Sequence, residues 1–527
     1  NNVAMGYQAL YANTTGTPNV AVGASALDAN TTGGSNVAAG FESLTANTEG
    51  NFNTALGRGA LAANVTAHRS TAVGYNALTT SNVSGNSNAY NAAFGYGAGL
   101  SVTTGTQNVL IGGLSGDAIT TGANNVAMGT SSLGTCTTGT YNVALGDSAL
   151  FATTTASNNT AVGGGALTAN TTGASNVAVG RSALDANTTG ARNVAIGYDS
   201  LGANTTASNN TAVGNASLDA NTTGTSNSAL GRNALSANTT ANNNTAVGMN
   251  ALLVNTTGAQ NTSTGAESLE ANTTGDFNTA YGYAALEANT TADANTAVGA
   301  YALLRNTTGY GNTAVGSLAG DAVTTGVNNT TVGRASLTTC TTGGSNVAMG
   351  VSALEALTSG SSNVAIGVNA GGAITTGFEN TCIGYAAGDA LTTGNNNIII
   401  GQSVDADSVS QANAIVIGVG FQGAGNDFSF GKAANVVSND FNADANWSRS
   451  SDVRLKKNIA DQTLGLDFIN ALRTVKYNWK ASGELDASDA QLAHLREEDA
   501  DGNIINHMDT DVVMHNFIAQ EVKAALD

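Results

Sequence analysis

The chain of 527 residues has 66 glycines, one proline and 5% aromatic residues, a composition unlike that of several ordinary globular domains. Only 10% of the residues are charged and 41% are hydrophobic, which excludes the highly charged, weakly hydrophobic composition of disordered chains. The formal net charge of −19 disfavours binding to nucleic acid or to anionic membranes. No apolar run approaches the roughly 18 residues of a spanning helix, so no membrane insertion is expected. The first residues have neither Met nor a basic leader, which predicts a fragment or a processed form.

A five-residue core, Asn-x-Ala-x-Gly, recurs along the chain at a nearly constant interval. Its glycines are Gly6, Gly23, Gly40, Gly57 and Gly74, then Gly95, and from there every 17th residue to Gly418. These 25 glycines define 24 steps, of which 23 are 17 residues long and one is 21. So strict a period predicts a solenoid in which each repeat is one rung. We expect the four-residue insertion to bulge from one face.

Within each rung, the core predicts a short strand that is apolar on both faces, as in Asn-Val-Ala-Val-Gly. One face is expected to look into the coil, and the other then needs a second cover. The simplest cover is an identical chain, so we predict a parallel homo-oligomer and favour a homotrimer. The following segment, residues 24–29 in the second rung, predicts a second strand or extended piece carrying Leu27. Asn-Thr-Thr-Gly then closes the rung with a turn.

The position seven residues after the strand glycine is usually an Asn that also reads as a glycosylation acceptor, as at Asn30. Other residues at this position are Ser81, Thr153, Cys136, Cys340, Leu357, Val102, Ile119, Val323, Ile374 and Leu391. In the last five of these rungs a glycine replaces the Leu four residues after the strand glycine. We infer that the two positions share one interior volume. Asn30, Asn170 and Asn187 are therefore expected to point inward and form an amide ladder, because a sugar acceptor faces solvent.

Three further sets of residues were weighed as functional candidates. Asp28, Asp185 and Asp219 share one rung position, which we interpret as solvated turn residues rather than calcium ligands. Cys136, Cys340 and Cys382 match neither a zinc pattern nor a disulfide framework and predict packed thiols. A tyrosine directly follows the strand glycine at Tyr7, Tyr75, Tyr96, Tyr198, Tyr283 and Tyr385. These tyrosines either stack on sugars or are scattered corner residues, and we favour the second. No metal or cofactor is expected.

The repeat ends after Gly418, and the composition changes again at Ser451. Residues 1–418 are predicted to form the solenoid, residues 419–450 a capping and linking segment, and residues 451–527 a separate domain. The last 77 residues carry 8 Lys and Arg and 14 Asp and Glu. Spacing compatible with helices occurs in residues 464–480 and 515–527.

Three blocks in this last segment, Ser-Asp-Val-Arg-Leu-Lys-Lys-Asn-Ile at 451–459, residues 464–480 and residues 515–527, resemble the peptidase S74 family. This family is the intramolecular chaperone at the C-terminus of endosialidase tailspikes and other phage fibres. The resemblance implies a small α+β domain that helps three chains to register and fold and then cuts itself away from them. Because the family usually continues into further helices, we expect the domain to be C-terminally truncated here.

The resemblance also implies a Ser-Lys dyad. Ser451 corresponds to the self-cleavage serine and Lys456 to its activating partner, with Asp452 and Arg454 in supporting positions. A lysine acts as a base when desolvation or a neighbouring cation lowers its pKa, and Lys457 is such a neighbour. The alternative is that the serine caps a helix and the lysine is a solvated charge.

The repeats themselves, as in Asn-Val-Ala-Val-Gly-Ala-Ser-Ala-Leu-Asp-Ala, are similar to the rungs in the head of YadA-type trimeric adhesins. That likeness implies a parallel β-roll assembled as a trimer. Together the two resemblances favour a phage tail fibre, located in the virion, that attaches to a host-surface receptor, expected to be a glycan. An extracellular bacterial or archaeal adhesin or filament protein stays open as an alternative, and a polysaccharide depolymerase is a third. No activity beyond a single self-cleavage is expected.

Overall fold

The computed structural model describes residues 1–442 and, further along, residues 472, 474–478, 480–485, 488, 495, 498–499, 501–505, 514–517 and 522. The chain divides into two compact units, Asn1–Ala445 and Asn446–Asp527. In the described parts no helix is long and apolar enough to cross a membrane.

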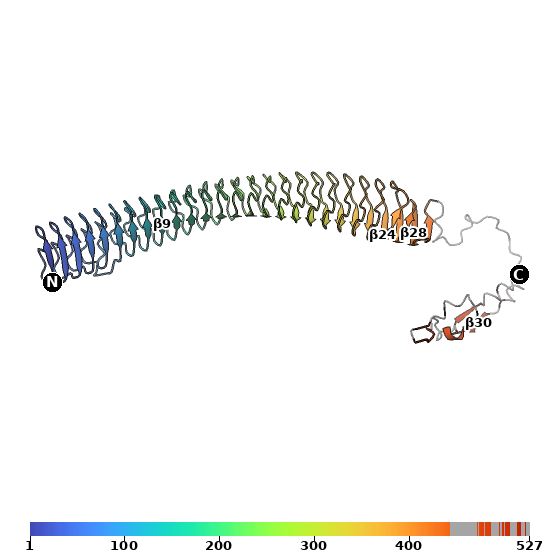
Figure 1. The fold of residues 1–527 in the computed structure, drawn as a ribbon, viewed down its shortest axis with the longest axis horizontal. Coiled ribbons are helices and arrows are strands. Elements are labelled where there is room, and N and C mark those ends of the chain that lie inside the picture. The colour runs from blue at the N-terminus through green and yellow to red at the C-terminus, as the bar shows by residue number, and fades with distance from the viewer. Residues whose placement is uncertain are drawn as a thin grey trace. The chain divides into compact units, whose positions relative to one another are not determined.

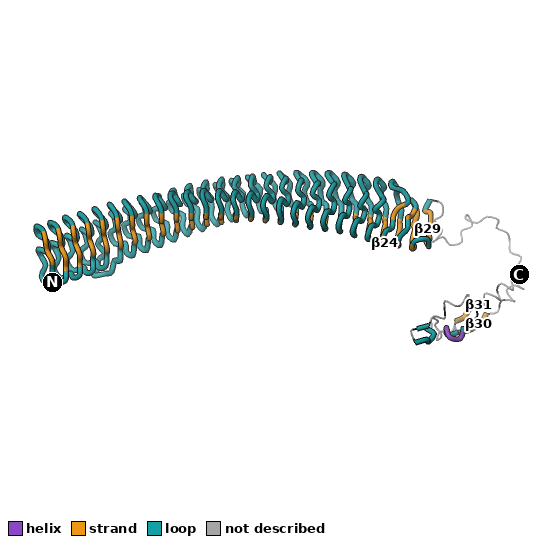
Figure 2. Tube along the Cα trace, in the orientation of Figure 1, coloured by secondary structure: helices purple, strands orange, loops and turns teal. Residues whose placement is uncertain are grey.

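The first unit is a parallel β-solenoid that coils in one direction along a gently curved rod (Figure 1). Each rung gives one short strand, and the rest of the rung is turn and loop (Figure 2). Successive strands pair in parallel with a register of 17 residues, as between Ala178 and Ala195. The predicted all-β solenoid of 17-residue rungs is thereby confirmed.

The strands of the repeat are β1 Val3–Met5, β2 Asn19–Val22, β3 Asn36–Ala39, β4 Thr54–Leu56, β5 Thr71–Val73, β6 Ala92–Phe94, β7 Val109–Ile111, β8 Val126–Met128, β9 Val143–Leu145, β10 Thr160–Val162, β11 Val177–Val179, β12 Val194–Ile196, β13 Thr211–Val213, β14 Ser228–Leu230, β15 Thr245–Val247, β16 Thr262–Thr264, β17 Thr279–Tyr281, β18 Thr296–Val298, β19 Thr313–Val315, β20 Thr330–Val332, β21 Val347–Met349, β22 Val364–Ile366, β23 Thr381–Ile383, β24 Ile398–Gln402 and β26 Ile415–Val419. At the C-terminal end follow β28 Asp427–Lys432, which pairs in parallel with β26, and β29 Asn435–Asp440, which pairs antiparallel with β28. A small second sheet joins β25 Asp405–Ala406 to β27 Gln422–Gly423.

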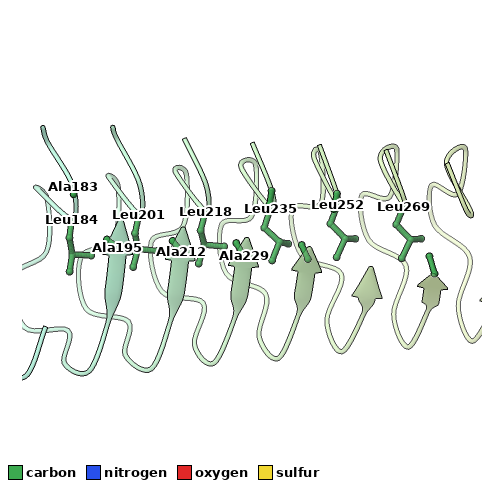
Figure 3. Close-up of a cluster of buried hydrophobic side chains, with 14 of the residues drawn as sticks. Ala183, Leu184, Ala195, Leu201, Ala212, Leu218, Ala229, Leu235, Leu252 and Leu269 are labelled. Atoms are coloured by element: carbon green, nitrogen blue, oxygen red, sulfur yellow. The ribbon is translucent and has the colours of Figure 1, made fainter. Parts of the chain in front are cut away.

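The interior is filled by two columns of apolar side chains. In most rungs the central strand residue is an Ala, and this Ala and the Leu four residues after the strand glycine are both fully buried, as Ala212 and Leu218 show. Figure 3 shows these side chains projecting into the coil from successive rungs. Because the strand position is usually the small alanine, the larger leucine of the rung has room in the interior.

The segment after the strand glycine is not the predicted second strand. In the second rung residues 24–29 form a series of turns, with left-handed backbone at Ser25 (φ 54°) and Leu27 (φ 51°). The prediction was wrong because the left-handed residues break the extended backbone, so that Ala26 and Leu27 are buried in succession rather than in alternation. The backbone groups of these turns bond to the next rung, as where the Leu27 amide donates to the Ser43 carbonyl at 3.1 Å.

The asparagines of Asn-Thr-Thr-Gly form the predicted ladder. Asn30 is fully buried, and its Nδ2 donates to Asn13 Oδ1 at 2.8 Å and to the Gly33 carbonyl at 3.0 Å. Its Oδ1 accepts from Asn47 Nδ2 at 2.8 Å. Within an uninterrupted run of the ladder, a buried amide such as that of Asn30 is thus bonded to the rungs on both sides and to its own turn, which offsets the cost of burying it.

A second ladder, which the sequence analysis missed, runs through the first residue of the strand core. Asn36 Nδ2 donates to the Gly50 carbonyl at 2.8 Å, and the backbone N–H of Asn36 donates to Asn19 Oδ1 at 3.0 Å. These asparagines are also fully buried or nearly so. The signal was present, because asparagine recurs at this position in every rung except those with Ser70 and Ala414.

The inferred exchange between the two interior positions is confirmed. A Cβ added to Gly371 would lie 3.0 Å from Ile374 Cδ1, and one added to Gly116 would lie 2.9 Å from Ile119 Cδ1. The aliphatic side chain therefore occupies the volume that leucine fills in other rungs. The same exchange ends the ladder: Asn306 Oδ1 lacks a hydrogen-bond donor, and the residue at this position in the next rung is Val323.

Replacing Asn238 by alanine is expected to destabilise the neighbouring rungs by about 2–3 kcal/mol, because two buried amide groups lose partners. Its Nδ2 donates to Asn221 Oδ1 at 2.9 Å, and its Oδ1 accepts from Asn255 Nδ2 at 3.1 Å. Hydrogen exchange of the flanking amides measures the local opening. The matched control is Thr240→Ala two residues away, at an exposed position. Equal exchange in the two variants would contradict the ladder's role.

In the second unit two strands are described, β30 Thr474–Tyr477 and β31 Met514–Phe517, which pair antiparallel. A single-turn 3₁₀ helix, η3 Ser482–Glu484, lies between them in sequence. Residues 474–477 and 515–517 of these strands fall in segments whose spacing is compatible with helices, so at these seven residues the prediction was wrong. Polar and apolar residues alternate within residues 474–477, as in a strand, but the longer apolar spacing of the surrounding segment favoured a helix.

Candidate functional site

An apolar stripe runs along the outer face of the solenoid's sheet. It consists mainly of the residue after the buried central strand residue, together with the residue before it where that is Val or Ile rather than Thr or Ser, and it continues from rung to rung because the register stays at equivalent positions. Large exposed members of the stripe are Val20, Val22, Leu56, Phe94, Met128, Ile196, Leu230, Tyr281, Val315, Met349, Ile366, Ile398 and Ile417. These side chains leave apolar surface exposed in many rungs along the sheet.

Aromatic and arginine side chains form short stacks at the corner that follows the strand glycine. The Arg58 guanidinium lies 5.7 Å from the Phe41 ring and 5.4 Å from the Tyr75 ring, and Tyr75 stacks on Tyr96 at 5.4 Å. Arg181 lies similarly over Tyr198, at 5.9 Å. These contacts run along the coil axis, so neighbouring rungs cover part of each ring. That these tyrosines are corner residues, rather than residues that stack on sugars, stays a prediction.

The recurring acidic position is more constrained than a solvated turn. Asp28 Oδ1 accepts from the Ala29 amide at 3.0 Å and from Thr45 Oγ1 at 2.7 Å. Partial burial, followed by repulsion from Asp199, raises the pKa of both Asp185 and Asp219. Among the described residues no group of three or more His, Cys, Asp or Glu side chains could hold a metal ion.

The three cysteines are buried free thiols, as predicted. Burial raises the pKa of Cys136 and Cys340 to about 11 and that of Cys382 to about 12. Their thiolate fraction is therefore small at neutral pH, and they serve as packing residues in the ladder and strand columns.

A pair of carboxyl groups lies near the C-terminal end of the solenoid. Asp405 is 7% exposed, and it is hydrogen bonded to the side chain of Asp389 in the preceding rung. Asp405 Oδ2 also accepts from the Ala390 amide at 2.9 Å. Desolvation, together with the neighbouring Asp389, raises the pKa of Asp405 to about 7.

Because the folded-state pKa of Asp405 is raised, its contribution to stability is complete below the unfolded value and is lost as pH rises toward 7. Amides of residues 388–406 are therefore expected to exchange about tenfold faster, after correction for intrinsic rates, at pH 8 than at pH 5. Asp389→Asn removes one of the two coupled charges and should flatten this dependence. Asp147→Asn, at an exposed solenoid position, is the control. A pH-independent wild type would contradict the shared-proton pair.

The residues implied as a cleavage dyad, Ser451 and Lys456, and their supporting residues Asp452 and Arg454 lie outside the described residues. Their roles stay predictions. Within residues 451–527 the structure describes the antiparallel pair of β30 and β31, in which Lys476 lies opposite His515 in the strand register.

The comparisons with known proteins concern this second unit. Residues 451–527 match the family model of peptidase S74, described as the chaperone of endosialidase. No curated protein matches the chain. A regular β-solenoid followed by such a chaperone segment fits a structural protein of the tail-fibre or endosialidase type.

Proposed function

We propose that this protein is a trimeric fibre, a phage tail fibre located in the virion, that attaches to a host-surface glycan and is assembled by its self-cleaving C-terminal segment. The observation that carries the proposal is the peptidase S74 match directly after a long regular solenoid. At about 4.8 Å per strand, 25 rungs extend roughly 120 Å, a length suited to a spacer that presents a surface.

The apolar stripe supports assembly with identical chains. A second copy placed in parallel presents the same stripe at the same spacing, so contacts repeat at every rung. Leu230 is 51% exposed and Tyr281 60% exposed on this face, and their burial would stabilise such an assembly by about 25 cal/mol per Å². Charged side chains are rare along the stripe, so its burial requires little desolvation of charge.

The chaperone segment answers a problem that the stripe creates. A one-residue slip between strands exchanges buried and exposed faces, and a slip of one whole rung costs little because the rungs are alike. A separate C-terminal domain that associates first would set the register of the three chains. Once it is removed, refolding has no template, so the fibre would persist because unfolding is slow.

Native mass spectrometry of the wild-type chain tests the assembly, with three copies as the expected result. Leu230→Lys places a charge in the stripe and is expected to reduce the trimer fraction at least tenfold at equal concentration. Thr223→Lys adds the same charge at an exposed position outside the stripe and should leave the trimer intact. A monomeric wild type, or two indistinguishable variants, would overturn the proposal.

The second candidate is an extracellular adhesin or filament protein at a bacterial or archaeal cell surface. The likeness of the repeats to trimeric adhesin heads favours it. A secretion signal or a cell-wall anchor in the complete gene would support it, whereas a baseplate-docking domain would support the tail fibre. A polysaccharide depolymerase would instead release reducing sugar from host capsule, which an end-group assay detects.

A further inference from the structure

We infer that a cavity between the rungs of β21 and β22 binds one sugar ring of a surface glycan. The cavity has a volume of about 280 Å³ and is lined by residues 359–362, Thr376, Phe378 and Glu379. It lies in the loop that closes each rung, outside the apolar stripe. The inference rests on the proposed attachment function and assigns a place to the contact.

The cavity exists because two neighbouring rungs differ from the rest at this corner. The first rung contributes a run of small residues, Ser359 to Ser362, where Gly360 lies at the closing turn. The next rung contributes Phe378, at a position that is Ala, Gly or Ser in several other rungs. The ring therefore projects beside a shelf of small residues, and the space above the shelf is left open.

The lining suits a pyranose. Phe378 is 44% exposed, and no aromatic ring or arginine stacks on it among the described residues, so its apolar face is available to the C–H face of a sugar. The adjacent Glu379 is exposed and supplies a carboxylate that accepts hydrogen bonds from sugar hydroxyls. Ser359, Ser362 and Thr376 add hydroxyl groups that both donate and accept.

Size and rigidity restrict the occupant further. The cavity lies near the lower limit of about 300 Å³ for small-molecule pockets, which fits one ring rather than a larger ligand. Its floor is fixed, because Ser361 Oγ accepts from the Gly344 amide at 3.1 Å and the Glu379 amide donates to the Ser361 carbonyl at 3.0 Å. A preformed site loses little conformational entropy on binding.

The test measures binding of the full chain to an array of purified bacterial capsular and O-antigen polysaccharides. The wild type is expected to bind at least one of them, and Phe378→Ala should weaken that binding tenfold or more. Tyr310 occupies the same rung position four rungs earlier and is 54% exposed. Tyr310→Ala, the matched control, should stay within twofold of the wild type.

A second variant places an aromatic ring in the cavity and leaves Phe378 and Glu379 unchanged. Ser362 has left-handed backbone (φ 59°), and Phe277 holds the equivalent position at φ 58°, so Ser362→Phe is expected to fold and to abolish binding. Ser226→Phe, at the same position eight rungs earlier, is the control.

A wild type that binds no polysaccharide on the array would overturn the inference, as would binding unchanged in both Phe378→Ala and Ser362→Phe. A loss of trimer in native mass spectra of Ser362→Phe would assign the cavity to contact between copies and overturn it as well. Fibres that attach to host cells equally with and without the Ser362→Phe change would refute this site alone and leave the attachment function standing.

Discussion

Gly214→Ala is expected to open the solenoid locally, with a loss of about 3 kcal/mol or more in the free energy of opening. Gly214 has φ 137°, a conformation that L side chains rarely adopt. A Cβ there would also lie 2.4 Å from the carbonyl oxygen of Gly231, the strand glycine of the next rung. The carbonyl oxygen belongs to the backbone and the position of a Cβ is fixed by the backbone, so no change of side-chain rotamer relieves the contact.

Hydrogen exchange of rungs β12 to β14 is the measurement, because a long repeat array does not unfold in a single two-state transition. The matched control is Gly164→Ala. Gly164 directly follows the strand glycine Gly163. Its backbone is not left-handed, and a Cβ there would meet nothing within 4 Å. If both alanine variants exchange alike, the close approach of neighbouring strand glycines is not what requires glycine at this position.

The solenoid could be predicted from the sequence because each rung solves the same packing problem in the same way. The strict 17-residue period fixes the register, and the exchange of Leu plus Asn for Gly plus an aliphatic residue reveals which positions share the interior. That exchange at Gly371 and Ile374 was enough to place the Asn30 position inside. Repetition turns a weak local signal into a strong one, since the same substitution rule is sampled many times.

Backbone conformation could not be predicted in the same way. Leucine is not a residue that favours left-handed backbone, yet Leu27, Leu218 and their equivalents adopt it in rung after rung. Their conformation is imposed by hydrogen bonds to the next rung, such as that from the Leu218 amide to the Ala234 carbonyl at 2.9 Å. A single rung does not contain this information, because its hydrogen-bond partners belong to its neighbours.

The candidate sites likewise divide into one that the repeat pattern predicts and others that depend on contacts between rungs. The apolar stripe was predictable, because strands with apolar residues on both faces leave one apolar face outside the coil. The Asp389–Asp405 pair and the cavity beside Phe378 were not, because each depends on residues from consecutive rungs that differ from the repeat. Departures from the repeat, read against its period, are therefore where function is to be sought in such a chain. The cleavage dyad rests on resemblance alone and calls for a direct chemical test.

Ser451→Ala is expected to convert a shortened chain into a full-length one. If Ser451 is the nucleophile, the wild type cuts the peptide chain beside it and releases the 77 residues from 451 onward. Its hydroxyl proton must pass to a base, and a neutral Lys456 amine, with its pKa lowered by burial on assembly, would accept it. Intact-mass spectrometry distinguishes the two lengths without ambiguity.

The neighbouring serine provides the matched control. Ser450→Ala alters an adjacent hydroxyl and should leave cleavage unchanged, whereas Lys456→Met should block it as completely as Ser451→Ala does. A wild type that stays full-length, or a Ser451→Ala chain that is still cut, would refute the dyad. An uncut chain that still forms trimers would show that registering the chains and cutting them are separable. In that case the retained chaperone should let the Ser451→Ala fibre refold after denaturation, while the cut fibre, having lost its template, should not.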